Sequence, residues 1–294
     1  MQRKRPQPIL NVFFIIVSML FILPFLYVIA ASLSSEADIA RYGYQLIPRT
    51  IDLSAYEWVF RDLSTIARAY VVTAFQAVLG TFLGVTVMTL IAYSISRPDY
   101  ALRRHVSFLV LFTMLFNGGL VPTYVIVTQW YGLGNTVWVY IFPLIVNPFF
   151  VIIIRTFFAQ LPREIFDSAH LDGASEIRIC MQLALPISTP VIAAVAFLFL
   201  QSRWDEWHNA LLYIRDRDLY TLQYLLQRIL LEAEYLRQMA AQSPEMESLL
   251  RDRELPRESL RYAMAIVAAG PMIFVFPFFQ RYFVSGLTVG SLKG

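Results

Sequence analysis

Residues 69–95 of the chain read AYVVTAFQAVLGTFLGVTVMTLIAYSI, a stretch without a single Asp, Glu, Lys or Arg. About 20 mostly apolar residues are enough for a helix to cross a lipid bilayer. A segment in lipid must satisfy its backbone hydrogen bonds internally, which excludes an open strand. The sequence therefore predicts a membrane-spanning helix at residues 69–95.

Five further stretches are comparably long and apolar. They are Ile9–Ala31, Val106–Thr128, Val137–Ile154, Ile187–Trp204 and Tyr262–Phe283. Composition agrees with a membrane protein, because 57% of the residues are hydrophobic and only 15% are charged, against roughly 25% charged in soluble domains. We expect an all-α, polytopic membrane protein with six transmembrane helices.

Seven prolines fall inside these stretches: Pro24, Pro122, Pro143, Pro148, Pro190, Pro271 and Pro277. Neighbouring helices can satisfy the backbone groups that a proline frees, so we expect kinked helices rather than loops.

Few side chains are suited to covalent chemistry or metal binding. The chain has one cysteine, Cys180, and three scattered histidines, so we expect no disulfide framework, no metal site and no catalytic residue. It also lacks the Gly-x-x-x-x-Gly-Lys-[Ser/Thr] pattern that cradles ATP phosphates. The predicted spans carry almost no charge, which disfavours an ion-coupled carrier or an intramembrane protease.

Basic residues near helix ends predict the orientation of the chain. With both termini in the cytoplasm, the short segments hold 11 basic residues inside and four outside. The segment 209–261, which is longer and weighs less, is then an outer loop. Cleavage of the first span as a signal peptide is an alternative, although its apolar run is longer than usual for such a segment.

The cytoplasmic loop 158–186 has a pattern of its own. Pro162 is expected to open a helix that carries Glu164 and Asp167 in its first turns, where the helix dipole favours acids. Gly173 should end it. A second helix, Ser175–Leu185, should end before Pro186. The small side chain of Ala169 would let another protein approach closely, although the helix could equally serve only as an interfacial anchor.

The spacing of this loop resembles the EAA loop of ABC-transporter permeases. The loop contains Asp167-Ser168-Ala169, then Gly173 after three residues, Leu183 after nine more, and Leu185-Pro186. These intervals are those of Glu-Ala-Ala-x3-Gly-x9-Ile-x-Leu-Pro. The departures are Asp for Glu, Ser for the first Ala and Leu for Ile, and the shorter Asp167 departs from the family's ion-pairing Glu.

Further stretches resemble the carbohydrate branch of this family, in permeases of the aldouronate or complex-oligosaccharide type that are related to the smaller maltose-permease subunit. They include Phe116–Tyr124, Arg155–Phe158, Asp172–Ser175, Asp216–Tyr220 and Phe279–Gly294. The resemblance implies a type I ABC importer permease fold. Residues 1–68 would form an N-terminal helix with an outer loop, and residues 69–294 a five-helix core.

The resemblance also implies roles for particular residues. Coupling to a separate ATPase would involve Glu164, Asp167, Ser168, Ala169, Asp172, Gly173, Leu185 and Pro186. The tail 284–294 would reach the ATPase interface through Gly286, Gly290, Lys293 and Gly294, unless it is simply a frayed terminus.

In such a transporter the chain would lie in the bacterial cytoplasmic membrane as a non-catalytic subunit. It would pair with a second permease in a heterodimer, two ATPase subunits and an extracytoplasmic binding protein that delivers a carbohydrate, such as an oligosaccharide. ATP and Mg would bind to the ATPase rather than to this chain. The alternative is a stand-alone membrane enzyme or channel whose loop matches by chance.

Polar residues near the outer side are candidates for the sugar path. Gln201, Asp205 and His208 would share one helix face beside Trp204, with Arg203 able to pair with Glu206. The alternative is an interfacial aromatic belt with snorkelling charges. Asn117 is a second candidate, or else it joins helices together. In the outer loop, Leu222–Gln242 has helical periodicity and could reach the binding protein or merely be solvated.

Overall fold

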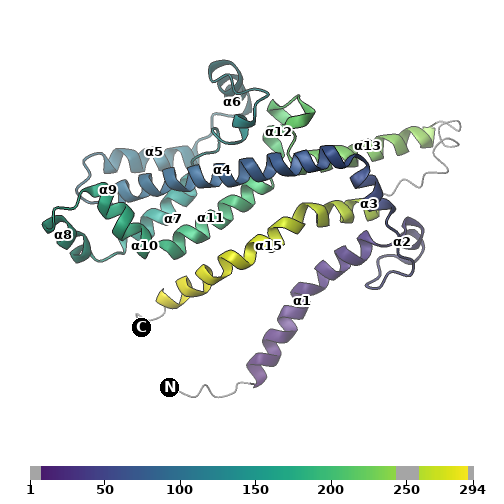
Figure 1. Ribbon diagram of the computed structural model, residues 1–294, viewed down its shortest axis with the longest axis horizontal. Coiled ribbons are helices and arrows are strands. Elements are labelled where there is room, and N and C mark those ends of the chain that lie inside the picture. Colours follow the sequence, from purple (N-terminus) through teal and green to yellow (C-terminus); the bar gives the residue numbers. More distant parts are fainter. Residues whose placement is uncertain (1–7, 243–257, 291–294) are drawn as a thin grey trace. The chain divides into compact units, whose positions relative to one another are not determined.

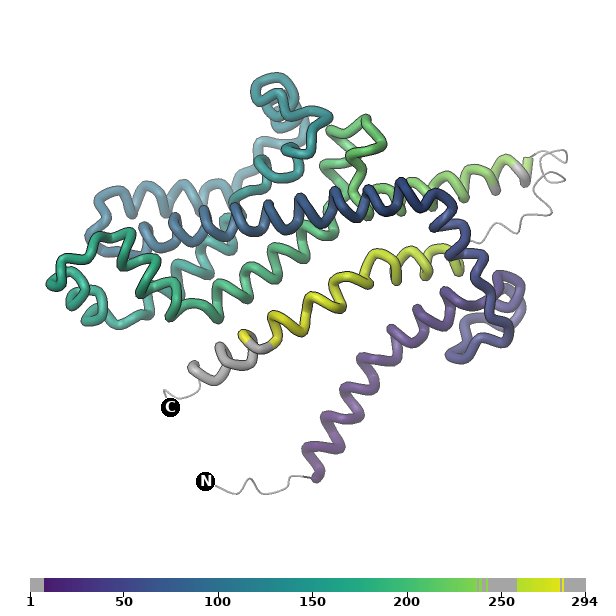
Figure 2. Tube along the Cα trace, viewed as in Figure 1, coloured from purple at the N-terminus to yellow at the C-terminus, as the bar shows by residue number. Residues whose placement is uncertain are grey.

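The computed structural model describes residues 8–242 and 258–290 (Figures 1 and 2). Within these ranges every regular element is a helix, and one isolated antiparallel bridge joins Ser34 to Ile51. The chain divides into two units, Met1–Ser64 with Leu225–Gly270 and Thr65–Tyr224 with Pro271–Gly294. The all-α prediction is therefore confirmed for the described residues.

The first unit begins with α1, Pro8–Ser32, which is apolar throughout and contains Pro24 without interruption. Its apolar side chains are mostly exposed, as expected for a helix that faces lipid. Three more helices contribute to this unit: α2 (Glu36–Tyr42), α3 (Ser54–Val59) and most of α13 (Leu222–Gln242). The helix predicted from the periodicity of residues 222–242 is thus confirmed.

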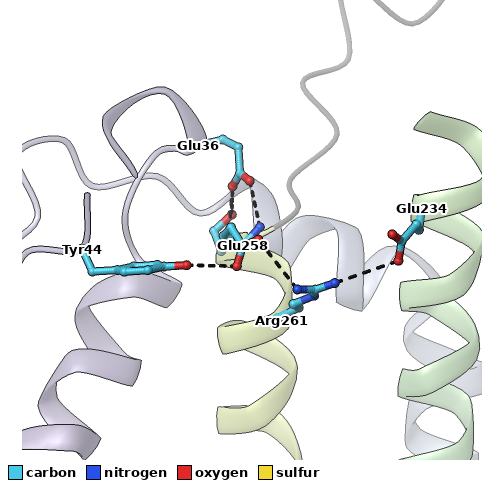
Figure 3. A network of polar contacts seen from close by, with 6 residues as sticks. Glu36, Tyr44, Glu234, Glu258 and Arg261 are labelled. Atoms are coloured by element: carbon cyan, nitrogen blue, oxygen red, sulfur yellow. Dashed lines mark hydrogen bonds and ion pairs between the residues drawn. The ribbon is translucent and has the colours of Figure 1, made fainter. Parts of the chain in front are cut away.

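A carboxylate caps the last long helix, α15 (Glu258–Gly290), from elsewhere in the first unit (Figure 3). Glu36 Oε1 accepts a hydrogen bond from the backbone N–H of Glu258 at 2.8 Å. Its Oε2 accepts from the N–H and the hydroxyl of Ser259, at 3.3 and 3.0 Å. A helix N-terminus has N–H groups without intrahelical partners, and Glu36 supplies both an acceptor and a negative charge for them.

The polar network continues along the first turn of α15 (Figure 3). The Tyr44 hydroxyl donates to Glu258 Oε2 at 3.0 Å, and Arg261 lies 3.7 Å from Glu258 Oε1 and 4.0 Å from Glu234 Oε2. These contacts join the loop after α2, helix α13 and α15 within one unit.

The second unit is built around α4 (Leu63–Ser96). Its other helices are α5 (Arg103–Leu115), α6 (Leu120–Val125), α7 (Pro148–Ala159), α8 (Arg163–Leu171), α9 (Glu176–Ile179), α10 (Leu185–Ile187), α11 (Thr189–Trp204), α12 (His208–Tyr213) and the C-terminal part of α15. The buried face of α4 contains small and polar residues, among them Thr73, Gln76, Gly80 and Gly84. Such residues allow close helix packing in membranes.

The third predicted span, Val106–Thr128, is not one continuous helix. Helix α5 ends at Leu115, α6 begins at Leu120, and the two segments are bent by 113°. Gly119 has φ +88°, and its backbone N–H donates to Asn117 Oδ1 at 2.9 Å. This Asx turn offers the backbone an alternative to the helix, which explains the break.

The fourth predicted span, Val137–Ile154, is also wrong as a single helix. A 3₁₀ turn, Val137–Tyr140, is followed by non-helical residues before α7 begins at Pro148. Asn147 caps α7 by accepting from the Phe149 N–H at 3.0 Å. Pro148 lies in the first turn of α7, where a missing N–H costs no intrahelical hydrogen bond, so it favours a helix start at this point. By contrast, Pro271 and Pro277 lie within α15.

A buried arginine satisfies the carbonyls that this break exposes. Arg203, on α11, is only 2% exposed. Its Nη1 donates to the Tyr140 carbonyl at 2.9 Å and its Nη2 to the Leu144 carbonyl at 2.7 Å. The guanidinium makes these bonds instead of the pairing with Glu206 that the sequence suggested, because a buried carbonyl without a donor costs several kcal/mol.

Two glycines on α4 make room for this arrangement. A Cβ atom at Gly80 would lie 2.4 Å from Arg203 Nη1. One at Gly84 would lie 2.4 Å from the Phe199 ring and 2.7 Å from the backbone oxygen of Ile145. Both positions therefore require the absence of a side chain.

We expect Glu36→Ala to lower the free energy of unfolding by about 1 kcal/mol, because it removes the acceptor at the start of α15. Thermal unfolding of the purified chain in detergent measures this change. The exposed Glu57, on α3, provides a control in Glu57→Ala. Equal unfolding temperatures for the two variants would contradict the capping role.

We expect Gly84→Ala to destabilise the second unit by about 1–3 kcal/mol through overpacking, since the backbone oxygen of Ile145 cannot move aside easily. Gly270→Ala is the matched control, because its Cβ would meet no atom within 4 Å in α15. The unfolding temperatures of the two variants are measured in detergent. If Gly84→Ala unfolds at the wild-type temperature, the approach of α4 to this backbone is not tight.

Candidate functional site

The candidate site is the short helix α8 and the segment that follows it. Pro162 occupies the N-cap position, and Gly173 follows the last turn with φ +77°. The Gly173 N–H donates to the His170 carbonyl at 2.9 Å, and the Ala174 N–H donates to the Ala169 carbonyl at 3.0 Å. This pair of bonds is a Schellman motif, which favours glycine at the left-handed position and confirms the predicted end of the helix.

The predicted second helix, Ser175–Leu185, is longer than expected. Helical structure runs from Glu176 to Ile187, and Cys180–Ala184 forms a π-helical turn just before Pro186. Such a widened turn accommodates a proline that lacks its own N–H. The expectation that the helix ends before Pro186 is therefore wrong.

One aromatic side chain anchors α8 to the second unit. Phe166 is 3% exposed and belongs to a core cluster that also includes Ile154, Ile179 and Cys180. The Arg97 guanidinium carbon lies 4.1 Å from the centroid of the Phe166 ring, a cation–π geometry. Helix α8 therefore has an inward residue that fixes its position against α7 and the end of α4.

A chain of polar contacts holds α8 and α9 together. His170 Nε2 lies 2.8 Å from Glu176 Oε1, and His170 Nδ1 lies 2.8 Å from the Phe166 carbonyl. The Tyr93 hydroxyl donates to Glu176 Oε2 at 2.7 Å. The hydrogen bond to Glu176, followed by that to the Phe166 carbonyl, raises the pKa of His170 above its usual value.

Most of the predicted coupling residues lie on the exposed side of this segment. Glu164, Asp167, Ser168, Asp172, Gly173 and Pro186 are exposed, and Leu185 is half-buried. Ala169 packs partly against the core cluster, so it lies toward the inward side rather than on the outer patch that the sequence suggested.

The sequence analysis missed two exposed apolar residues at the same place. Leu171 is 89% exposed and Ile177 is 74% exposed. With 3.6 residues per turn, Leu171 lies roughly 140° around the helix from Phe166, so its outward position follows once Phe166 is recognised as the anchor. Exposed apolar side chains beside Asp167 and Asp172 are typical of a protein-binding surface.

The residues proposed for the C-terminal contact are only partly described. Helix α15 continues through Gly286 to Gly290. Lys293 and Gly294 lie outside the described residues.

The candidate sugar-path residues are not brought together as predicted. Helix α11 ends at Trp204, which is buried, and His208 begins the separate helix α12, so the shared face with Gln201 is wrong. Gln201 Nε2 does donate to Asp205 Oδ2 at 3.1 Å. Asn117 lies in the break between α5 and α6 rather than within a helix.

We expect the His170 contact to stabilise the loop at acidic pH. A raised pKa in the folded state means that the stabilisation is complete below the unfolded pKa of about 6.5 and is lost as the pH rises through the folded value. Hydrogen exchange of residues 163–179, corrected for intrinsic rates, should show greater protection in the wild type than in His170→Gln at pH 6, and a smaller difference at pH 9. The exposed His105→Gln is the control, and a pH-independent difference would contradict this linkage.

Comparison with known proteins extends over nearly the whole chain. The family model described as "binding-protein-dependent transport system inner membrane component" matches residues 69–289. Protein LplC of Bacillus subtilis (strain 168) is 37% identical over 273 residues, which cover 93% of this chain and 90% of LplC. The polygalacturonan/rhamnogalacturonan transport system permease protein YtcP of the same organism is 32% identical and covers 96% of each chain.

A solved structure shares the fold. One chain of a bacterial ABC transporter involved in the import of the acidic polysaccharide alginate has a TM-score of 0.72 and 25% sequence identity, covering 96% of this chain and 100% of its own. This chain belongs to the family of binding-protein-dependent transport system inner membrane components, the permease subunits of ABC importers.

Proposed function

We propose that this permease forms part of the path for an oligosaccharide and is driven by a separate ATPase that docks on α8. The observation that carries the coupling role is the construction of α8. Its inner side is fixed by Phe166 and by the contact between His170 and Glu176, whereas its outer side presents acids and Leu171. A fixed helix with an exposed, mixed polar and apolar face can transmit a push from a partner.

The ATP chemistry is assigned to that partner. The chain lacks a P-loop sequence, so we propose that ATP and Mg bind to the ATPase subunits and that this chain is the non-catalytic element. Closure of the ATPase pair would favour one arrangement of the permease helices over another through α8. The alternative of a stand-alone enzyme or channel has no support in the comparisons.

The substrate proposal rests on the relatives. One is named as a permease for polygalacturonan and rhamnogalacturonan, and the solved transporter imports alginate. Both names refer to carbohydrate polymers, so we propose an oligosaccharide as the cargo here. The Gln201, Asp205 and Gln223 amide–carboxylate contacts offer polar groups suited to sugar hydroxyls.

We further propose six spans with both termini in the cytoplasm. Three helices are long and apolar enough to cross a membrane, namely Pro8–Ser32, Ser54–Ser96 and Glu258–Gln280. The bent pair Arg103–Leu115 with Leu120–Trp130 would supply a further span. Thr189–Trp204, bent by 82° from the cytoplasmic segment Glu176–Ile187, would supply another. Helix α7 with the turn held by Arg203 would complete the sixth, and the charge bias of the short loops supports the orientation.

The remaining partners follow from the family's mode of assembly. We propose a heterodimer with a second permease, two ATPase subunits and an extracytoplasmic binding protein. The loop 209–261, which contains most of α12 and all of α13, would contact the binding protein, and the end of α15 would approach the ATPases.

We expect Leu171→Asp to reduce co-purification of the ATPase with the permease at least tenfold and to abolish oligosaccharide uptake. Leu171 is almost fully exposed, so its replacement should leave the fold intact, and loss of a buried apolar anchor costs about 2 kcal/mol or more of binding free energy at an interface.

The control is Ile47→Asp, since Ile47 is 81% exposed and belongs to the first unit, whereas α8 belongs to the second. ATPase activity in the membrane-extracted complex and uptake of labelled sugar are measured for both variants. Unchanged co-purification of ATPase with the Leu171→Asp permease would refute docking at α8.

A further inference from the structure

A basic pocket lies where α4, α5 and α7 meet, apart from the exposed face of α8. It has a volume of ≈ 690 Å³, and its lining includes Arg103, Arg104 and Arg155 together with Phe108 and Leu111. A second hollow of ≈ 360 Å³ shares Arg104 and Phe108 with it. Neither lining contains a carboxylate among the described residues.

Two of the three arginines are held in place through one side of the guanidinium group. Arg103 Nε donates to the Ile95 carbonyl at 3.1 Å, and Arg155 Nε donates to the same carbonyl at 3.4 Å. These bonds satisfy the Ile95 carbonyl near the end of α4. The planar, forked ends of the two guanidinium groups are left at the pocket. Such forks suit bidentate binding of a phosphate.

The start of α5 adds further positive potential. The helix has 13 residues, and its N-cap, Leu102, makes no side-chain capping hydrogen bond. The first N–H groups of a helix lack intrahelical partners and carry a partial positive charge. The pocket therefore combines three positive charges, two of them held by hydrogen bonds, with a helix N-terminus that has no side-chain cap, and this combination favours an anion.

The rest of the pocket is apolar and continues into the membrane-crossing part of α5. Phe108 is 63% exposed and Leu111 is 48% exposed, one and two turns beyond Arg104. Arg97–Arg104 follow directly after the span that ends at Ser96. The charged part is thus at headgroup level and the apolar part at acyl-chain level, because a spanning helix ends at the polar interface.

We propose that this pocket binds an anionic glycerophospholipid, with its phosphate on Arg103, Arg104 and Arg155 and an acyl chain along Phe108 and Leu111. The apolar wall distinguishes a lipid from a free phosphate, which would gain nothing from it. The bound lipid would join the α4–α5 connection, α5 and α7, to which the pocket's lining residues belong.

The test uses the full chain co-purified with its partner subunits in detergent. Phosphatidylglycerol and phosphatidylcholine with identical acyl chains are added, and bound lipid is counted by native mass spectrometry. One basic residue near a membrane surface contributes about 1 kcal/mol, so Arg104→Gln should weaken phosphatidylglycerol retention about fivefold and leave phosphatidylcholine unchanged. Arg104 is exposed, and an unchanged unfolding temperature verifies the fold.

Arg217→Gln is the matched control, because Arg217 is an exposed arginine outside the pocket lining. We expect this variant to retain phosphatidylglycerol as fully as the wild type does. Equal losses in both variants would show only a general charge effect and would overturn the site. Displacement of the lipid by millimolar inorganic phosphate would identify a free-anion site instead.

A photo-crosslinking residue at Ala101, which also lines the pocket, distinguishes the occupants. Capture of phosphatidylglycerol in the membrane supports the proposal. Capture of the second permease or the ATPase at this position would make the pocket a protein interface and overturn it.

Discussion

The central physical constraint in this permease is that backbone carbonyls buried inside the protein need hydrogen-bond donors. The break before α7 frees carbonyls at Tyr140 and Leu144, and the guanidinium of Arg203 supplies hydrogen bonds to both. Gln76 on α4 donates in turn to the Arg203 carbonyl at 2.6 Å. A charge that would be costly alone in lipid is tolerated because it compensates an irregular backbone.

Buried contacts also position α8, the proposed coupling helix. Phe166 enters the core cluster, and Arg97 lies over its ring at the end of α4. Tyr93, on α4, contacts Glu176 and so connects the segment after α8 with the long helix. Packed side chains and hydrogen bonds, rather than a flexible loop alone, therefore connect α8 and the segment after it to α4, which is the kind of connection that the proposed coupling would use.

Much of the fold could be predicted from the chain, but the breaks could not. The apolar run at Pro8–Ser32 and the periodicity of Leu222–Gln242 were enough to identify those helices. The runs Val106–Thr128 and Val137–Ile154 are equally apolar, yet Asn117 and Pro143 accompany interruptions there. Hydropathy measures the tendency to enter lipid and is insensitive to whether the freed backbone groups find donors elsewhere.

The sequence alone determined the class of protein, the position of the loop helix and its end at Gly173, because these depend on composition and on local backbone preference. The spacing of the loop also located the residues of the candidate coupling site. Only the tertiary structure decided which of them face outward, that Leu171 joins them, and that Arg203 is buried. Those features depend on contacts between residues far apart in the chain, such as Arg203 with Tyr140, and no local pattern encodes them.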